Sequence, residues 1–282
     1  MDPDLEAFLR EDLGAGDITT RALDDGRRVR ARIVAKEDAI VCGMAEASAV
    51  FAHLGAKAEH LAQDGARVQA GAEVMRVAGP AAAVLTGERL ALNLLMRMSG
   101  IATMTRALQD QVAAANPRCR VAATRKTTPG FRRFEKRAVE AGGGDPHRFG
   151  LHDAFLVKDN HLLLVPDVAE AVRRCRALDP AKLLQVEADR PEQAFAAAEA
   201  GADAVLLDNF GPDEARRLYG ELKARFPRLM VEVSGGIHAG NVAAYAHAAD
   251  RISMGALTHS ARAIDFGLDV LGEDEDGAGR TP

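Results

Sequence analysis

Short apolar segments in the second half of the chain are each followed directly by charged or small polar residues. Five segments show this pattern: Val121–Ala123 precedes Thr124, Arg125 and Lys126; Ala154–Val157 precedes Lys158; Leu183–Val186 precedes Glu187; Ala204–Leu207 precedes Asp208; and Leu229–Val233 precedes Ser234, Gly235 and Gly236. In parallel α/β folds the carboxyl ends of the strands meet at one edge, where active sites form. One charged residue after one strand means little, but the repetition predicts that these side chains gather in one site.

The cations of this set predict a ligand with several negative charges. Arg125, Lys126 and Lys158 would repel one another unless an anion held them, and a following loop would add His147 and Arg148. Arginine makes planar, two-pronged contacts with carboxylates or phosphates, whereas lysine acts as a mobile point charge. The combination predicts a ligand that carries carboxylates as well as phosphates.

Solvated surface charge is the alternative for each cation taken singly, and it is the commoner case for a lone lysine or arginine. We expect surface charge for four cations whose spacing predicts one solvent-exposed face of a helix: Arg132, Arg133, Lys136 and Arg137. The strand-end cations differ because several of them converge.

Glu187 and Asp208 supply two carboxylates to the same predicted edge. They could hold Mg²⁺ through a phosphorylated substrate or bind ribose hydroxyls. The spacing supports equally well a role in balancing nearby lysine and arginine charges. Hydrolysis by a carboxylate pair, as in glycosidases, would leave the cations unexplained.

Two glycine-containing segments match the usual phosphate site late in α/β barrels. They are Ser234-Gly235-Gly236 and Met254-Gly255-Ala256, and we expect a helix to start near Asn241. Backbone N–H groups and the helix N-terminus would meet the anion there. An ordinary strand-to-helix turn is the alternative.

The elements that position these residues follow a change of pattern near Pro117. Beyond it, short apolar runs alternate with alanine-rich helical stretches, which indicates a buried parallel sheet. About six such units favour a barrel, although spacing alone also allows an open sheet.

The first 80 residues instead indicate a small β-rich domain with helices near residues 3–12 and 44–54. A helical pattern follows over residues 81–115, and Ser99-Gly100 is expected to break it into two helices. We expect an N-terminal domain with linking helices over residues 1–115, a barrel over 116–269 and a frayed, acidic tail over 270–282.

The composition of the 282 residues is that of a globular protein, with 48% hydrophobic and 27% charged residues. The formal net charge of −5 argues against nucleic acid or an anionic membrane as a partner. The three cysteines are far apart and form no CxxC pair, which indicates a reducing compartment. The acidic N-terminus excludes a secretory signal, and no apolar run approaches the roughly 20 residues of a membrane span. These features predict a cytoplasmic protein.

Several catalytic motifs are missing from the sequence. The eight histidines form no HExxH, which argues against a zinc hydrolase. Neither a GxSxG elbow nor a GxxxxGKS/T loop is present, nor the acidic pair of the commoner Rossmann-like phosphoribosyltransferases.

The segment Ala123–His161 strongly resembles the quinolinate phosphoribosyltransferase family; it reads ATRKTTPGFRRFEKRAVEAGGGDPHRFGLHDAFLVKDNH. The resemblance covers almost the whole chain, through EDLGAGDITT, GERLALNLLMRMSGIAT, LLDNF, SGGI and MGALTHS. The central block is highly specific, whereas LLDNF or SGGI alone would be weak. The family fold it implies is an N-terminal α/β sandwich domain plus an open α/β barrel, type II phosphoribosyltransferase-like.

The resemblance implies a carboxylating phosphoribosyl transfer in NAD biosynthesis. The family converts quinolinate and phosphoribosyl pyrophosphate into nicotinate mononucleotide, carbon dioxide and pyrophosphate, with Mg²⁺ as the cofactor. It also implies a homodimer, or a higher homo-oligomer, with shared active sites.

The resemblance assigns roles residue by residue. Arg89 matches an arginine that reaches quinolinate in the neighbouring subunit. The other matched residues fall into four groups: Arg125, His147, Arg148 and Lys158 around the two carboxylates and the pyrophosphate; Lys126, with Thr124 beside it, at a phosphate; Glu187 and Asp208 near Mg²⁺ and ribose; and Ser234–Gly236 with Met254–Ala256 at the 5′-phosphate.

The sequence departs from the family pattern at two positions, since Ala123 and Gln185 stand where many relatives have acidic residues. Two other classes of function stay open. One is a related barrel protein associated with molybdenum transport, which would not be expected to keep the TRK, HR and KDNH sequences together. The other is a non-catalytic anion-binding module, in which the two acids would have no purpose.

Overall fold

The computed structural model describes residues 1–274, and the chain forms two compact units. Residues 1–104 form the first unit together with the described residues from 261 onward, and residues 105–260 form the second. The N-terminal unit is thus closed by a segment from the far end of the sequence.

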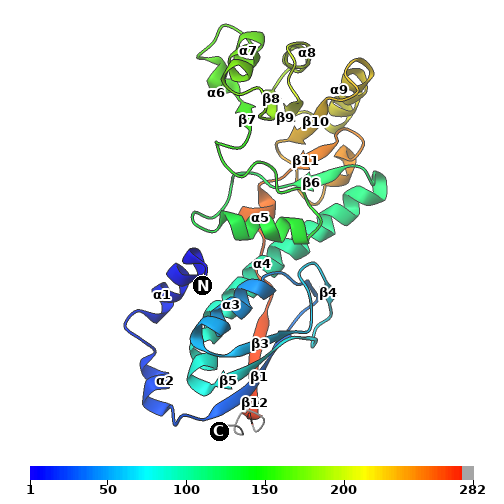
Figure 1. The fold of residues 1–282 in the computed structure, drawn as a ribbon. Helices are drawn as coiled ribbons and strands as arrows, with labels where there is room; N and C mark the ends of the chain where they lie inside the picture. Colours follow the sequence, from blue (N-terminus) through cyan, green and yellow to red (C-terminus); the bar gives the residue numbers. More distant parts are fainter. Residues whose placement is uncertain (275–282) are drawn as a thin grey trace. The chain divides into compact units, whose positions relative to one another are not determined.

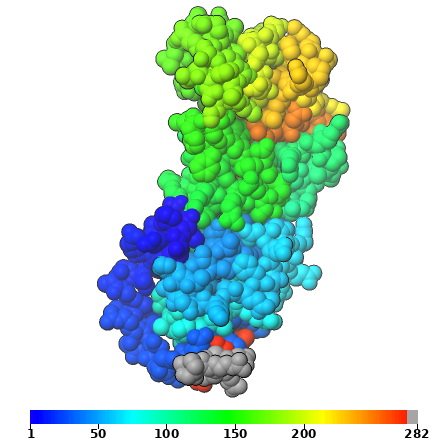
Figure 2. All heavy atoms as spheres, in the orientation of Figure 1, coloured from blue at the N-terminus to red at the C-terminus, as the bar shows by residue number. Residues whose placement is uncertain are grey.

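The N-terminal unit is built on an antiparallel sheet with the strand order β12-β1-β5-β3 (Figure 1). Its elements in chain order are α1 (Pro3–Leu13), α2 (Ile18–Leu23), β1 (Arg28–Ala35), β2 (Ala39–Ile40), α3 (Met44–Leu54), β3 (Lys57–His60), β4 (Arg67–Val68), β5 (Glu73–Pro80), the first part of α4 (Ala81–Ala115) and β12 (Phe266–Glu273). Residues of α1 and α2, dark blue in Figure 2, lie along one side of this unit. The expected helices near 3–12 and 44–54 are confirmed.

Alternation along β1 explains how this sheet acquires a core. Ala31 and Ile33 point to one face and are buried, together with Phe51 of α3 and Leu95 of α4, in one hydrophobic cluster. Because successive side chains of a strand point to opposite faces, the period-two pattern supplies one buried face. Strands β1 and β5 both lie within the first 80 residues, where the sequence predicts a small β-rich domain.

Helix α4 runs without interruption from Ala81 to Ala115, so the expected break at Ser99-Gly100 is wrong. Gly100 serves close packing instead. A Cβ placed on it would lie 2.0 Å from the carbonyl oxygen of Arg262. Only glycine lets the returning chain approach the helix so closely.

The tail expected over residues 270–282 is wrong at its first residues, because residues 270–273 belong to strand β12. Val270 pairs with Ala31 and Asp269 with Arg32 in an antiparallel ladder, and Phe266 is buried in the N-terminal core. Residues 261–269, which were expected to complete the barrel, therefore belong to the first unit. The rest of the expected tail, residues 275–282, lies outside the described residues.

The second unit is an open α/β barrel formed by a six-stranded parallel sheet with the order β6-β11-β10-β9-β8-β7. Its strands are β6 (Arg120–Ala122), β7 (Phe155–Val157), β8 (Leu184–Ala188), β9 (Ala204–Asp208), β10 (Met230–Ser234) and β11 (Arg251–Ser253). Its helices are the end of α4, α5 (Arg132–Ala141), α6 (Asp159–Leu162), α7 (Val168–Leu178), α8 (Pro191–Glu199), α9 (Pro212–Arg225), the 3-10 helix η1 (Val242–Tyr245) and α10 (Ala256–His259). Helices α7, α8 and α9 line one side of the strands in Figure 1.

The register of the parallel strands separates two faces. Val186, Val205, Val231 and Ile252 are fully buried and lie on one face. The other face, called here the site face, carries the residues that alternate with them: Gln185, Glu187, Leu206, Asp208, Glu232, Ser234, Arg251 and Ser253. This parallel sheet therefore has polar residues on one face.

Within residues 1–274, no helix combines the length and the hydrophobicity that crossing a membrane requires.

Candidate active site

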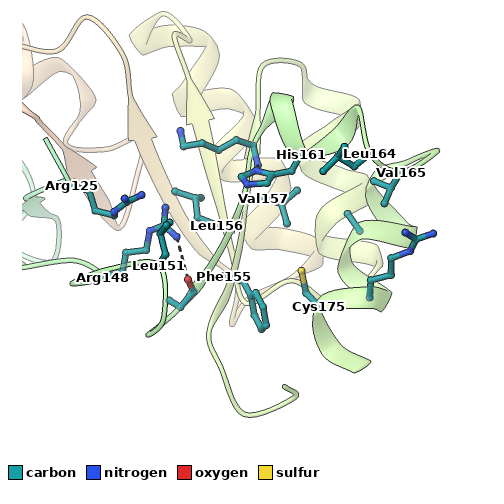
Figure 3. A pocket seen from close by; sticks show the side chains of 14 residues that line it. Arg125, Arg148, Leu151, Phe155, Leu156, Val157, His161, Leu164, Val165 and Cys175 are labelled. Atoms are coloured by element: carbon teal, nitrogen blue, oxygen red, sulfur yellow. Dashed lines mark hydrogen bonds between the residues drawn. The ribbon is translucent and has the colours of Figure 1, made fainter. Parts of the chain in front are cut away.

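A cavity of about 540 Å³ lies along β7 and α7 and reaches the carboxyl end of β7 at Lys158 (Figure 3). Arg125, Arg148, Lys158 and His161 are its ionisable residues near the strand ends. Figure 3 shows the two arginines on one side of the cavity and Leu164, Val165 and Cys175 on the other. The structure thus brings three of the predicted cations to one place.

The guanidinium groups of Arg125 and Arg148 line this cavity together although they come from different loops. Arg148 donates through Nη1 to the carbonyl oxygen of Ala154 over 3.2 Å, which fixes the direction of its side chain. Burial, and then the positive charge of Arg125, lower the pKa of Arg148 below its ordinary value. Two mutually repelling guanidinium groups in a cavity favour an anionic ligand that can occupy both.

Lys158 and Glu187 form an ion pair beside the arginines. Val157 pairs with Val186 in the sheet, so the next residues of the two strands stand side by side. The backbone N–H of Lys158 donates to Nδ1 of His161 over 3.0 Å. His161 therefore fixes the backbone at Lys158. The sequence did not predict this role for His161, although the residue ends the KDNH sequence that matches the family.

Asp208 and Ser234 meet at the next pair of strand ends, where they are register partners. Asn209 adopts a left-handed φ of 62°, and its backbone N–H donates to the Ser234 carbonyl over 2.9 Å. Gly235 has a φ of 91°, and a Cβ there would lie 2.2 Å from Oδ1 of Asn209. The predicted Ser-Gly-Gly loop is thus packed against the Asp-Asn pair by a contact that only glycine permits.

Lys126 lies at the second predicted phosphate segment. A Cβ on Gly255 would approach the side chain of Lys126 to 2.8 Å, and Thr258 donates to the Lys126 carbonyl over 2.7 Å. The backbone N–H of Lys126 donates to the hydroxyl of Thr124 over 3.0 Å. Lys126, Thr124 and the Met254–Ala256 segment are therefore neighbours, as the phosphate hypothesis requires.

The expected helix near Asn241 is wrong in kind. The structure has only the four-residue 3-10 helix Val242–Tyr245 there, with Asn241 at its N-cap. A single tight turn has too few aligned peptide units for a helix dipole. Any anion at these loops would be held by loop backbone and by Lys126.

Glu187 and Asp208 offer the carboxylates that a divalent cation would use. Glu187 is the register partner of Leu206, so both acids lie on the site face. Among residues 1–274 no group of three or more His, Cys, Asp or Glu side chains could hold a metal by itself. Mg²⁺ in proteins is commonly bound by one or two carboxylates together with substrate phosphates and water. This donor set fits a Mg²⁺ ion that binds with a phosphorylated substrate.

His147 is close to the predicted cations but does not line the cavity. Its Nε2 lies 3.2 Å from Oε2 of Glu232, a carboxylate with no exposed surface. The same oxygen accepts from Arg251 at 2.6 Å and from Gln185 at 3.0 Å. Burial alone raises the pKa of Glu232, but His147 and Arg251 outweigh it and lower this pKa to about 2.

The polar group around Glu232 was missed from the sequence. Leu229–Val233 was interpreted as an apolar strand, yet a glutamate inside such a strand needs a buried partner. That isolated charge was the signal that could have found it. Gln185, a departure from the family pattern, donates to this carboxylate through its amide.

Lys136 corrects the prediction of one wet helix face. Only 4% of it is exposed, and its ammonium group donates to the Pro146 carbonyl. Burial and the charge of Arg132 lower the pKa of Lys136 to about 8. Lys136 therefore supports the loop that carries His147 and Arg148.

Arg89 belongs to the other unit, where it is exposed on α4. Its predicted role beside quinolinate stays a prediction.

The parallel barrel with cations at its strand ends places the chain in the class of α/β-barrel proteins that bind anionic ligands at the carboxyl edge of the sheet. Comparison with known proteins narrows this class. Residues 17–99 match the quinolinate phosphoribosyl transferase N-terminal domain, and residues 101–269 match the C-terminal domain of the same family. The chain belongs to the quinolinate phosphoribosyl transferase family.

Individual relatives agree along nearly the whole length. The probable nicotinate-nucleotide pyrophosphorylase (carboxylating) of Methanothermobacter thermautotrophicus is 44% identical over 273 residues, covering 95% of this chain and 98% of that protein. The human nicotinate-nucleotide pyrophosphorylase (carboxylating) is 40% identical, covering 96% and 91%. The structure of the nicotinate-nucleotide pyrophosphorylase from Francisella tularensis has a TM-score of 0.88 at 34% identity and covers 94% of both chains.

Proposed function

We propose that this protein transfers the phosphoribosyl group of phosphoribosyl pyrophosphate to quinolinate and releases carbon dioxide, yielding nicotinate mononucleotide and pyrophosphate for NAD biosynthesis. The observation that carries the proposal is the pair of guanidinium groups, Arg125 and Arg148, in one cavity next to the Lys158–Glu187 ion pair. Quinolinate carries two adjacent carboxylates, which suit two converging arginines.

The reaction needs no covalent bond to the protein. The quinolinate nitrogen forms a bond to the anomeric carbon of the ribose while the bond from that carbon to pyrophosphate breaks. The pyridinium nitrogen then accepts electron density as the 2-carboxylate leaves as carbon dioxide, and the ring carbon takes up a proton.

Positioning and charge would supply most of the rate acceleration. Arg125 and Arg148 hold the carboxylates and so place the ring nitrogen. Lys158 and Lys126 offset the charge that develops on the departing pyrophosphate, and Glu187 with Asp208 faces the cationic ribose carbon. The arginines must not bind the leaving carboxylate too tightly, because only contacts that strengthen towards the transition state accelerate the step.

Mg²⁺ is part of this proposal. Glu187 and Asp208 would hold it, and it would neutralise pyrophosphate charge when bound with the substrate. A shared site in a homodimer, with Arg89 supplied by the partner subunit, and a cytoplasmic location are proposed as well. The location is supported by the three cysteines, which are far apart in the sequence and form no CxxC pair.

One assay separates this function from the other classes. Quinolinate consumption and carbon dioxide release are measured together, with phosphoribosyl pyrophosphate, in the presence and absence of Mg²⁺. We expect equimolar loss and release only when both substrates and Mg²⁺ are present. Binding of quinolinate without turnover would favour a non-catalytic anion-binding module, and no binding would favour a different ligand.

A further inference from the structure

Both ring nitrogens of His147 are used by the protein itself. The backbone N–H of Arg148 donates to Nδ1 over 2.7 Å, and Nε2 lies 3.2 Å from Oε2 of Glu232. Because Nδ1 accepts a hydrogen bond, Nε2 carries a proton and donates it to the carboxylate. The His147 side chain is only 8% exposed. Both nitrogens of the imidazole therefore contact the protein, one the loop backbone and the other a side chain in the barrel interior.

Glu232 is itself anchored in the barrel interior. Arg251 contacts the Glu232 carboxylate at 2.6 Å and Oδ2 of Asp145 at 3.2 Å. Asp145 in turn accepts from the backbone N–H of His147 over 2.6 Å through Oδ1. The four residues form a closed ring of contacts, which ties the loop segment 145–148 to strands β10 and β11.

The four-residue ring of contacts holds the backbone of His147 in an unfavourable conformation. His147 has a φ of 57°, a left-handed conformation that residues other than glycine, asparagine and aspartate rarely adopt. Such a conformation persists where the surroundings determine it. The backbone conformation of His147 sets the direction in which the next residue, Arg148, leaves the loop. The guanidinium group of Arg148 lines the cavity together with that of Arg125, although the two positive charges repel each other in the absence of a ligand.

We infer that Glu232 is a positioning residue for Arg148 and acts on it through His147. This inference rests on the proposed function, because it takes the quinolinate carboxylates to be the ligand of Arg148. It gives His147 a role different from the ligand contact predicted from the sequence. Glu232 has no exposed surface and does not line the cavity.

The test begins with Glu232→Gln, which keeps the shape of the side chain and removes its charge. The loop then loses its fixed direction, while the phosphate segments are unchanged. We expect the KM for quinolinate to rise roughly tenfold to a hundredfold, because small displacements of a positioned group have effects of that size. The KM for phosphoribosyl pyrophosphate should stay within about twofold. Titration calorimetry with quinolinate alone should show the same loss of affinity.

A double-mutant cycle with His147→Asn tests the route of the effect. If Glu232 acts through His147, adding Glu232→Gln to the His147→Asn variant should change the quinolinate KM by less than about twofold, since coupled residues are not additive. Additive effects, or equal increases in the KM values of both substrates, would overturn the inference. Should Glu232→Gln fail to fold, a rise in the quinolinate KM alone in His147→Asn still supports the inference, and unchanged KM values refute it.

Asp250→Asn is the matched control. Asp250 accepts from Tyr219 and Val231 immediately before β11 and does not line the cavity. This variant should lower the melting temperature without separating the two KM values. Wild-type turnover distinguishes the two proposals: if wild type consumes no quinolinate the proposed function fails, whereas normal wild-type turnover with an unaffected Glu232→Gln variant refutes only the positioning role.

Discussion

Lys158 forms an ion pair with Glu187 across two neighbouring parallel strands, at the point where both strands end. The lysine side chain is 43% exposed and the glutamate side chain 13%, so the pair lies at the boundary between sheet and cavity. One partner faces the substrate region while the other anchors it to the sheet. The pair therefore orients a positive charge that solvent alone would leave mobile.

Lys158→Met should lower kcat/KM by about a hundredfold, or roughly 3 kcal/mol of transition-state stabilisation. The change removes charge near the departing pyrophosphate and leaves Glu187 without its ion-pair partner. Steady-state kinetics with both substrates measures it. Lys223→Met is the control, because Lys223 pairs with Asp250 away from the cavity and should leave kcat/KM nearly unchanged. Equal effects of the two variants would contradict the assignment.

Arg148→Ala should reduce kcat/KM for quinolinate by about 10²–10³, since a charged hydrogen-bonding partner contributes about 1.5–3 kcal/mol per bond. Arg148→Lys should recover little, because a point charge cannot make the two-pronged contact. The measurement is kcat/KM at varied quinolinate with saturating phosphoribosyl pyrophosphate. A near-normal value for Arg148→Ala would refute its place at the carboxylates.

Residues at the carboxyl ends of strands were predictable from the sequence. Lys158 directly follows β7, and Glu187 and Asp208 lie at the carboxyl ends of β8 and β9. In a parallel sheet such positions converge whatever the intervening loops do. The family resemblance added the substrates. Neither the strand-end positions nor the family resemblance depends on how distant segments of the chain pack together.

Residues whose roles depend on distant packing were not predictable. Lys136 has the spacing of a surface residue, and it is buried only because the segment around Pro146 folds over it. The sequence from residue 270 onward has the composition of an acidic tail, and its first residues form part of β12 only because they pair with β1. Gly100 resembles a helix breaker until the chain at Arg262 returns against it. In each case the deciding partner is far away in the sequence.

Gly235→Ala should destabilise the loop that joins the Asp208 and Ser234 strand ends. The added Cβ would meet Asn209 at 2.2 Å and would also require a φ of 91°. We expect the free energy of unfolding to fall by about 2 kcal/mol or more, and kcat/KM to fall with it. Urea unfolding and steady-state kinetics give the two quantities.

Gly201→Ala is the control for that comparison. Gly201 has a φ of 92°, but a Cβ there would meet nothing within 4 Å. It should cost about 1 kcal/mol of backbone strain and leave kcat/KM unchanged. The difference between the two variants isolates the contact with Asn209, and equal losses would mean that backbone strain alone matters at Gly235.

Lys136 gives a prediction for pH. Its pKa falls from 10.5 to about 8 in the folded protein, chiefly because of burial. Between these two values the unfolded chain binds more protons than the folded one, so this residue makes stability rise with pH. Relative to Lys136→Met, wild type should gain up to about 3 kcal/mol in unfolding free energy between pH 8 and pH 10.5. Urea unfolding of both proteins across that range measures the difference. A constant difference would show that Lys136 keeps its ordinary pKa and that the Pro146 carbonyl and nearby carboxylates offset its burial.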